Sequence, residues 1–156
     1  LICYSPNIKV FDERASLLTM PWGLEIARIV KGGNYNIWEA PTGAEKYWHL
    51  KYRLEATVEL QRLLEGTMQP QVFNQITAPT FLGYYYQDEV HQDSVVRVDA
   101  MLDMFENLGS SIKKKVAFPN AQAHALPSPY FSKDVENVFA QTCVFIEQDL
   151  GIQPKY

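Results

Sequence analysis

The sequence predicts an α/β fold with about three parallel strands, flanking helices and a helical insertion between the first two strands. Residues 76–150 alternate strand, helix, strand, loop and helix, and crossover connections of this kind join parallel strands. A short apolar run at 1–8 precedes a long segment, 12–70, in which no strand is evident. We therefore assign 1–8 and 71–156 to one core and 9–70 to a helical cap or lid.

The first half of the chain supplies one strand and the predicted cap. LICYSPNI (1–8) is typical of a short buried strand that stops at a Ser-Pro-Asn turn. Residues 12–32 predict a helical region interrupted at Pro21-Trp22-Gly23. Thr42 and Glu45 have the spacing of a capping box, which predicts a helix from Thr42 to about Gly66.

The second half supplies the remaining strands. ITAPTFLGYYY (76–86) and KKKVAF (113–118) are rich in residues that favour strands. Between them, residues 100–108 repeat apolar side chains at helical spacing and end before a glycine. Ser132 is a candidate cap for the last helix, which continues to Gly151.

Composition disfavours several classes of protein. The chain has 156 residues, 47% hydrophobic and 21% charged, which fits one globular domain. The net charge of −4 disfavours nucleic acid, and the basic run Lys113–Lys115 is typical of a solvated strand end. Cys3 and Cys143 form no CxxC pair, which disfavours structural zinc or a disulfide framework. No apolar run reaches the roughly 18 residues of a membrane span.

One histidine lies in a loop that would present it for chemistry. His124 stands among alanines in FPNAQAHALPSP (118–129), directly after the expected strand at 113–118. The loop at 87–94, which follows the expected strand at 76–86, carries Asp88 and Asp93. Carboxyl ends of parallel strands meet at one edge of a sheet, where a carboxylate can orient a histidine base. Acid followed by histidine is also the order that ends a Ser–Asp–His triad.

These two strand–loop segments, ITAPTFLGYYYQDEVHQDSVV and KKKVAFPNAQAHAL, resemble the last two strands of an α/β-hydrolase. LICYSPNI resembles the strand that precedes the cap in that family, and 9–75 occupy the cap's place. The resemblance implies the carboxyl-terminal half of a serine hydrolase that acts on small-molecule esters, or on amides, with no cofactor. It implies His124 as the catalytic histidine.

The identity of the acid stays open between two residues. Asp88 lies at the family's usual offset from Pro79, whereas Asp93 fits a D-x-V-V pattern with Val95 and Val96. We favour Asp93. The other aspartate would then be a loop carboxylate that caps the next helix.

The nucleophile of such an enzyme is missing from this sequence. No serine lies in G-x-S-x-G; the serines are Ser5, Ser16, Ser94, Ser110, Ser111, Ser128 and Ser132. Cys3, within an apolar strand, is expected to be a buried, inert thiol. We expect the nucleophile elbow, which is the turn with the G-x-S-x-G motif, and the oxyanion-hole loop to lie in a missing amino-terminal half of the same polypeptide. Any targeting signal would lie there too, so the sequence leaves the compartment unknown. The isolated chain is expected to be inactive.

Other candidates for a site are weaker. His91 is expected to be a solvated loop residue, and His49 to be packed in the cap or to line a pocket. A metal site of His91, Asp88 and Asp93 has only spacing in its favour, so no metal is expected. The cap is rich in aromatic side chains that either pack on the sheet or line a substrate pocket. We single out Trp38, Trp48 and Tyr52 as pocket lining.

Two further expectations concern partners. The alternative hypothesis is a non-catalytic binding module that keeps the fold and uses the cap as an apolar groove. It stays open because a fold alone never proves activity. A chain that opens within a strand at Leu1–Tyr4 would also expose an unpaired strand edge. We therefore expect the fragment to self-associate.

Overall fold

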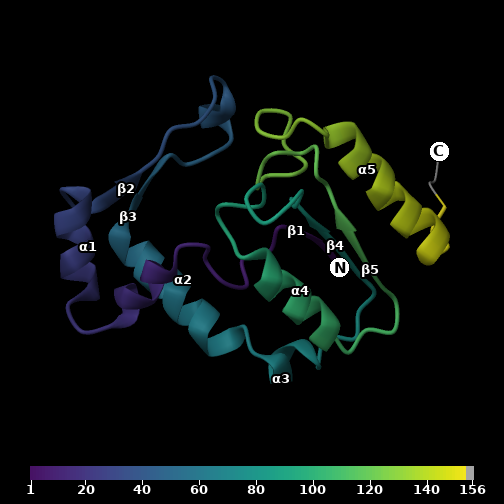
Figure 1. The fold of residues 1–156 in the computed structure, drawn as a ribbon, viewed down its shortest axis with the longest axis horizontal. Helices are drawn as coiled ribbons and strands as arrows, with labels where there is room; N and C mark the ends of the chain where they lie inside the picture. The colour runs from purple at the N-terminus through teal and green to yellow at the C-terminus, as the bar shows by residue number, and fades with distance from the viewer. Residues whose placement is uncertain (154–156) are drawn as a thin grey trace. The chain divides into compact units, whose positions relative to one another are not determined.

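A computed structural model describes residues 1–153 and confirms the mixed α/β class. Three parallel strands form one sheet in the order β1-β4-β5 (Figure 1). They are β1 (Ile2–Tyr4), β4 (Thr80–Tyr84) and β5 (Lys113–Ala117). Tyr4 of β1 is in register with Gly83 of β4, which is in register with Val116 of β5. The central strand therefore joins two segments from opposite ends of the chain.

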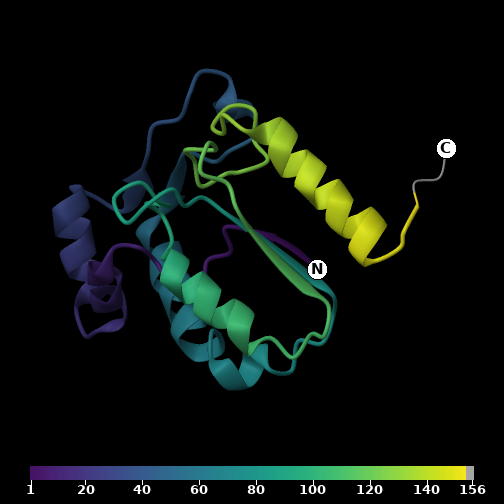
Figure 2. The same cartoon turned by 45° about the vertical axis from the view of Figure 1, so that its right-hand side comes forward.

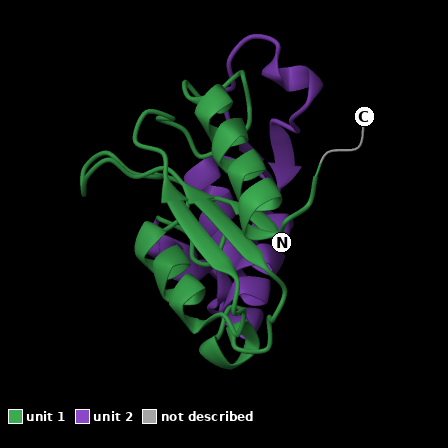
Figure 3. Cartoon of the chain, turned by 90° about the vertical axis from the view of Figure 1, so that its right-hand side faces the viewer, with its two compact units in different colours: residues 1–11, 68–156 green, residues 12–67 purple. Residues whose placement is uncertain are grey.

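The chain divides into two compact units (Figure 3). Unit 1 comprises Leu1–Phe11 and the chain from Met68 onward, and unit 2 comprises Asp12–Thr67. Besides the sheet, unit 1 contains α3 (Pro70–Phe73), α4 (Val98–Asn107) and α5 (Val135–Val144), which continues as the π-helical turn η3 (Phe145–Asp149). Unit 2 contains η1 (Glu13–Thr19), α1 (Gly23–Lys31), β2 (Tyr35–Ile37), η2 (Ala44–Lys46), β3 (Lys51–Arg53) and α2 (Leu54–Thr67).

Every residue of β4 is buried, because both faces of a parallel sheet are covered by helices. Successive side chains of a strand point to opposite faces, so Leu82 and Phe81 belong to different clusters. Leu82 packs in a cluster with α4 residues such as Met101, and Phe81 in one with α5 and η3 residues such as Phe145. Helices α4 and α5 thus cover opposite faces of the sheet (Figure 2).

The basic run at the start of β5 has structural partners. The Lys113 ammonium donates hydrogen bonds to the carbonyl oxygens of Phe105 and Glu106, at 2.8 and 3.0 Å. These carbonyls belong to the last turn of α4, where cations are favourable. Lys114 forms an ion pair with Asp149. The run therefore stabilises a helix end and packs within unit 1.

The prediction that 12–70 lacks strands was wrong. Strands β2 and β3 pair antiparallel, with Tyr35 opposite Arg53 and Ile37 opposite Lys51. Each strand has three residues, which is too short for an alternating pattern to appear in the sequence.

The helix expected from Thr42 begins instead at Leu54. Residues 44–46 form a single 3-10 turn, and the Glu45 carboxylate accepts from the Gly43 amide at 2.6 Å. Gly43 has a φ of 95°, so the expected capping box does not form around Thr42. The Ser132 cap is also displaced: its hydroxyl accepts from the Asp134 amide at 3.3 Å, and α5 begins only at Val135.

Over the part of the chain that the structure describes, no helix has the length and apolar character needed to cross a bilayer.

Candidate active site

The structure brings His124 and Asp93 together, at the edge of the sheet where the strands end. The His124 Nδ1 lies 2.8 Å from the Asp93 Oδ2. Asp93 is fully buried, whereas 37% of the His124 side chain is exposed. An imidazole held through Nδ1 leaves Nε2 as the nitrogen that can exchange a proton with another group.

The loop after β4 holds the Asp93 carboxylate in one orientation. Residues 87–91 form a small loop closed by a bridge between Tyr86 and Gln92, so that the Asp93 amide returns to the strand end and donates to the Tyr85 carbonyl at 3.1 Å. The Asp93 Oδ1 accepts from the amides of Val95 and Val96, at 2.9 and 3.1 Å. Each carboxylate oxygen thus has a donor, and Oδ2 is left for the histidine.

The loop after β5 is closed by Lys133. Its amide donates to the Ala121 carbonyl at 3.0 Å, and its ammonium donates to the Gln122 Oε1 at 2.7 Å. Gln122 has a φ of 52°, in the left-handed region that side chains with a Cβ disfavour. The small residues around His124 therefore form a tightly folded loop. The parts of Lys133 and Gln122 in closing this loop could not be predicted, because neither contact leaves a pattern in the sequence.

Burial has the largest single effect on the Asp93 carboxyl and acts to raise its pKa, but the hydrogen bond to His124 and the smaller effects that act with it together outweigh burial. The charge of His124 and the amides of Val95 and Val96 act in the same direction as that bond. The pKa of Asp93 is therefore lowered, and the group is a buried carboxylate at neutral pH.

The free energy of unfolding is expected to fall as the pH is lowered through the pKa of folded Asp93. An aspartate in the unfolded chain titrates near its ordinary pKa of about 3.9, so the ionised form stabilises the fold above that pH. This contribution is lost as Asp93 takes up a proton at lower pH. Urea unfolding from neutral pH down to about pH 3 should show a steeper acid loss for the wild type than for Asp93→Asn. Parallel pH profiles for the two would contradict the prediction.

Asp88, the alternative acid, has a different partner. Both of its carboxylate oxygens lie 2.9 Å from the Nδ1 of His91, and Oδ1 also accepts from the amides of Val90 and His91. These contacts, led by the hydrogen bond to His91, lower the pKa of the exposed Asp88 carboxyl. Asp88 and His91 thus form a separate surface pair within the small loop.

Other candidate chemistry has little structural support. Within residues 1–153, no group of three or more His, Cys, Asp or Glu side chains is placed to hold a metal ion. Cys3 is half-buried, and burial raises the pKa of its thiol, which disfavours the reactive thiolate. His49 is exposed, and not packed as expected, in the loop between β2 and β3, where its carbonyl accepts from the Trp38 indole at 3.2 Å.

Unit 2 contains a hollow of about 490 Å³ between η1, the start of α1 and α2. Its lining includes Leu18, Trp22 and Val58. The aromatic residues singled out in the sequence, Trp38, Trp48 and Tyr52, lie on β3 and in the loop that leads to it, outside this lining. Their part in a substrate pocket stays a prediction.

Comparisons with known proteins support the fold. No family model matches the sequence, and no curated protein matches it. A solved structure from work on LipS and LipT, two metagenome-derived lipolytic enzymes, superposes with a TM-score of 0.67 at 12% identity. The match covers 94% of this chain and 54% of that one, so the chain spans about half the length of this neighbour. At this identity the likeness concerns the fold alone: a hydrolase-like fold shared with a lipolytic enzyme.

Proposed function

We propose that this chain is the carboxyl-terminal part of a serine hydrolase of the α/β-hydrolase type that cleaves carboxylic esters. The observation that carries the proposal is the 2.8 Å contact between buried Asp93 and partly exposed His124. The order of the two residues along the chain and the fold of the lipolytic neighbour support it.

In the proposed reaction His124 is the general base. Its Nε2 accepts the proton of a serine hydroxyl supplied by the rest of the polypeptide while the serine oxygen attacks the ester carbonyl. The same nitrogen then donates that proton to the departing alcohol, and a water molecule releases the acid by the reverse sequence. Asp93 stays ionised, fixes the tautomer through Nδ1 and stabilises the imidazolium. Asp88 has no such role in the proposal, because its carboxylate is engaged by His91.

The remaining parts of the proposal concern unit 2 and the sheet edge. Residues 12–67 would serve as the cap over the substrate, with Trp38, Trp48 and Tyr52 as candidates to contact it. The same catalytic groups would also serve for the hydrolysis of amides. Strand β1 lies at an edge of the sheet, where we propose that it pairs with the missing half or, in the isolated chain, with a second copy. If the isolated chain sediments as a monomer at high concentration, the proposed pairing of β1 with a second copy is wrong.

The proposal is tested on the coding sequence upstream of Leu1. We expect a strand followed by Gly-x-Ser-x-Gly there, and we expect the extended polypeptide to hydrolyse a p-nitrophenyl ester of a short fatty acid. His124→Ala should lower its kcat by several orders of magnitude, because the serine then lacks its base. The 156-residue chain alone should show no turnover.

The matched control is His91→Ala, which removes a histidine that also touches an aspartate but lies in a different pair. It should leave kcat nearly unchanged. An upstream elbow without its serine, or an extended polypeptide that keeps its activity without His124, would overturn the hydrolase proposal. The non-catalytic binding module would then be the better account.

A further inference from the structure

The chain that leaves β1 runs back along the loop that carries Asp93. Residues 9–11, which we call the strap, lie antiparallel to residues 95–97, with an isolated bridge between Val10 and Val96. One backbone hydrogen bond of 2.9 Å lies on each side of this bridge. The strap is therefore bonded to the chain just after the proposed acid.

The two hydrogen bonds hold both ends of the segment 95–97. The Phe11 amide donates to the Val95 carbonyl, and the residue after Phe11 is the first of unit 2. The Arg97 amide donates to the Lys9 carbonyl. The side chains of Lys9 and Phe11 are exposed, so these two bonds, rather than the two side chains, join the strap to the loop.

The segment that the strap holds supplies the donors that orient the acid. The amides of Val95 and Val96 donate to Oδ1 of Asp93, at 2.9 and 3.1 Å. The other oxygen, Oδ2, lies 2.8 Å from Nδ1 of His124. A shift of the two amides would turn the carboxylate and weaken its bond to the imidazole, because hydrogen bonds depend steeply on alignment.

Apolar packing fixes the same segment from the side of the core. Val96 is buried in the cluster that contains Leu82 and Met101. Ile8, the residue before the strap, packs against the same cluster. The strap thus connects the end of β1 to a fixed point beside the acid before the chain continues into unit 2.

We propose that the strap is a positioning element for the Asp93–His124 pair. Its two backbone hydrogen bonds hold the amides of Val95 and Val96, and these amides keep the carboxylate in line with the imidazole. The strap touches neither the substrate nor the reacting atoms. This inference deepens the proposed function and rests on it, since the strap acts in the same proton transfer.

The test removes one strap bond and leaves the residues of the pair intact. Arg97→Pro deletes the amide that donates to Lys9, and Arg97 has a φ of −76°, which proline also adopts. Arg97→Ala is the matched control, because it loses the same side chain and its ion pair with Asp99 but keeps the amide. Phe11→Pro and Phe11→Ala form a second pair for the other bond.

Two measurements on the 156-residue chain need no catalysis. Hydrogen exchange of the Val95 and Val96 amides should be at least about tenfold faster in the proline variants, and should change by less than about threefold in the alanine variants. Carbon-13 NMR of the Asp93 carboxyl should show a pKa above that of the wild type in the proline variants, because the two amides then stabilise the carboxylate less.

The extended polypeptide gives the catalytic readout. Each proline variant should lower kcat by roughly 10- to 100-fold with little change in KM, because a misplaced catalytic group weakens the transition state more than substrate binding. The alanine variants should keep the kcat of the wild type within about threefold. An extended polypeptide without any activity would overturn the hydrolase proposal, and the exchange and pKa measurements would still decide whether the strap orients Asp93.

Three results would overturn the proposal for the strap. The first is equal exchange of the Val95 and Val96 amides in the proline and alanine variants. The second is equally faster exchange of the Phe118 amide, which donates to Tyr84 within the sheet, because the strap would then support the whole unit. The third is loss of the wild-type circular dichroism spectrum in both proline variants; if only one of them unfolds, the other decides.

Discussion

Asp93→Asn is expected to lower the kcat of the extended polypeptide by about 10⁴-fold, the loss known when the orienting acid of a Ser–His–Asp triad becomes an amide. The asparagine keeps an oxygen that can accept from the amides of Val95 and Val96, so the loop should stay folded. An amide group facing Nδ1 of His124 would favour the wrong tautomer and would not stabilise the imidazolium. The measurement is kcat on a p-nitrophenyl ester at neutral pH.

Asp88→Asn is the matched control for this prediction. It makes the same change in the same loop, but on a carboxylate that contacts His91. We expect kcat to change by less than about threefold, because the group is exposed and forms no contact with His124. A large loss in Asp88→Asn with none in Asp93→Asn would reverse the assignment of the acid, and activity in both variants would remove both residues from that role.

The sheet and the histidine–aspartate pair could be predicted because they depend on local patterns. β-Rich runs at 76–86 and 113–118 mark β4 and β5, and the rule that parallel strands end at one edge brings their loops together. The choice between Asp88 and Asp93 could not be made from spacing. It depends on the small loop at 87–91, whose turn lets Asp88 bond to His91 and returns Asp93 to the end of β4.

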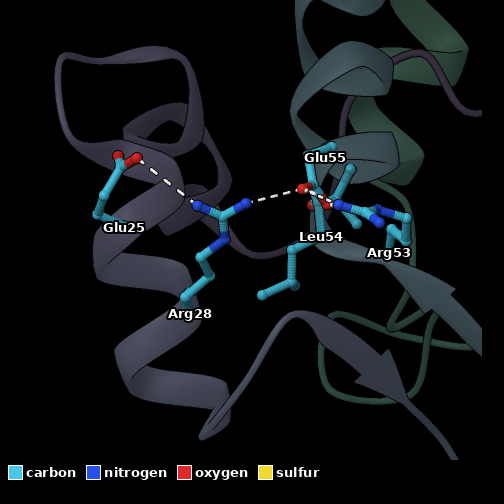
Figure 4. Close-up of polar contacts among 6 residues, drawn as sticks. Glu25, Arg28, Arg53, Leu54 and Glu55 are labelled. Atoms are coloured by element: carbon cyan, nitrogen blue, oxygen red, sulfur yellow. Dashed lines mark hydrogen bonds and ion pairs between the residues drawn. The ribbon is translucent and has the colours of Figure 1, made fainter.

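Unit 2 was harder to predict because its geometry depends on contacts between segments. Strands β2 and β3 are defined by pairing with each other, so neither three-residue run is recognisable alone. Periodicity shows that α1 has an apolar face, but it cannot show which way that face points. The contact of α1 with α2 includes the ion pair between Arg28 and Glu55 (Figure 4), which the sequence does not reveal.

Phe81→Ala is expected to lower the free energy of unfolding of the 156-residue chain by about 3–5 kcal/mol. Phe81 is fully buried on the central strand, with its ring centroid 5.5 Å from that of Phe145 and 6.2 Å from that of Tyr4. Truncation removes buried apolar surface and leaves a cavity between β1, β4 and η3 that a close-packed core fills poorly.

Urea unfolding measures this loss, and Phe139→Ala supplies the contrast. Phe139 lies on α5 with 69% of its surface exposed, and alanine is the better helix former, so its replacement should change stability by less than about 0.5 kcal/mol. The difference between the two variants separates burial from the mere loss of a phenyl group. If Phe81→Ala were as stable as Phe139→Ala, that result would contradict the described packing of α5 and η3 against the sheet. The position of the His124 loop depends on this packing.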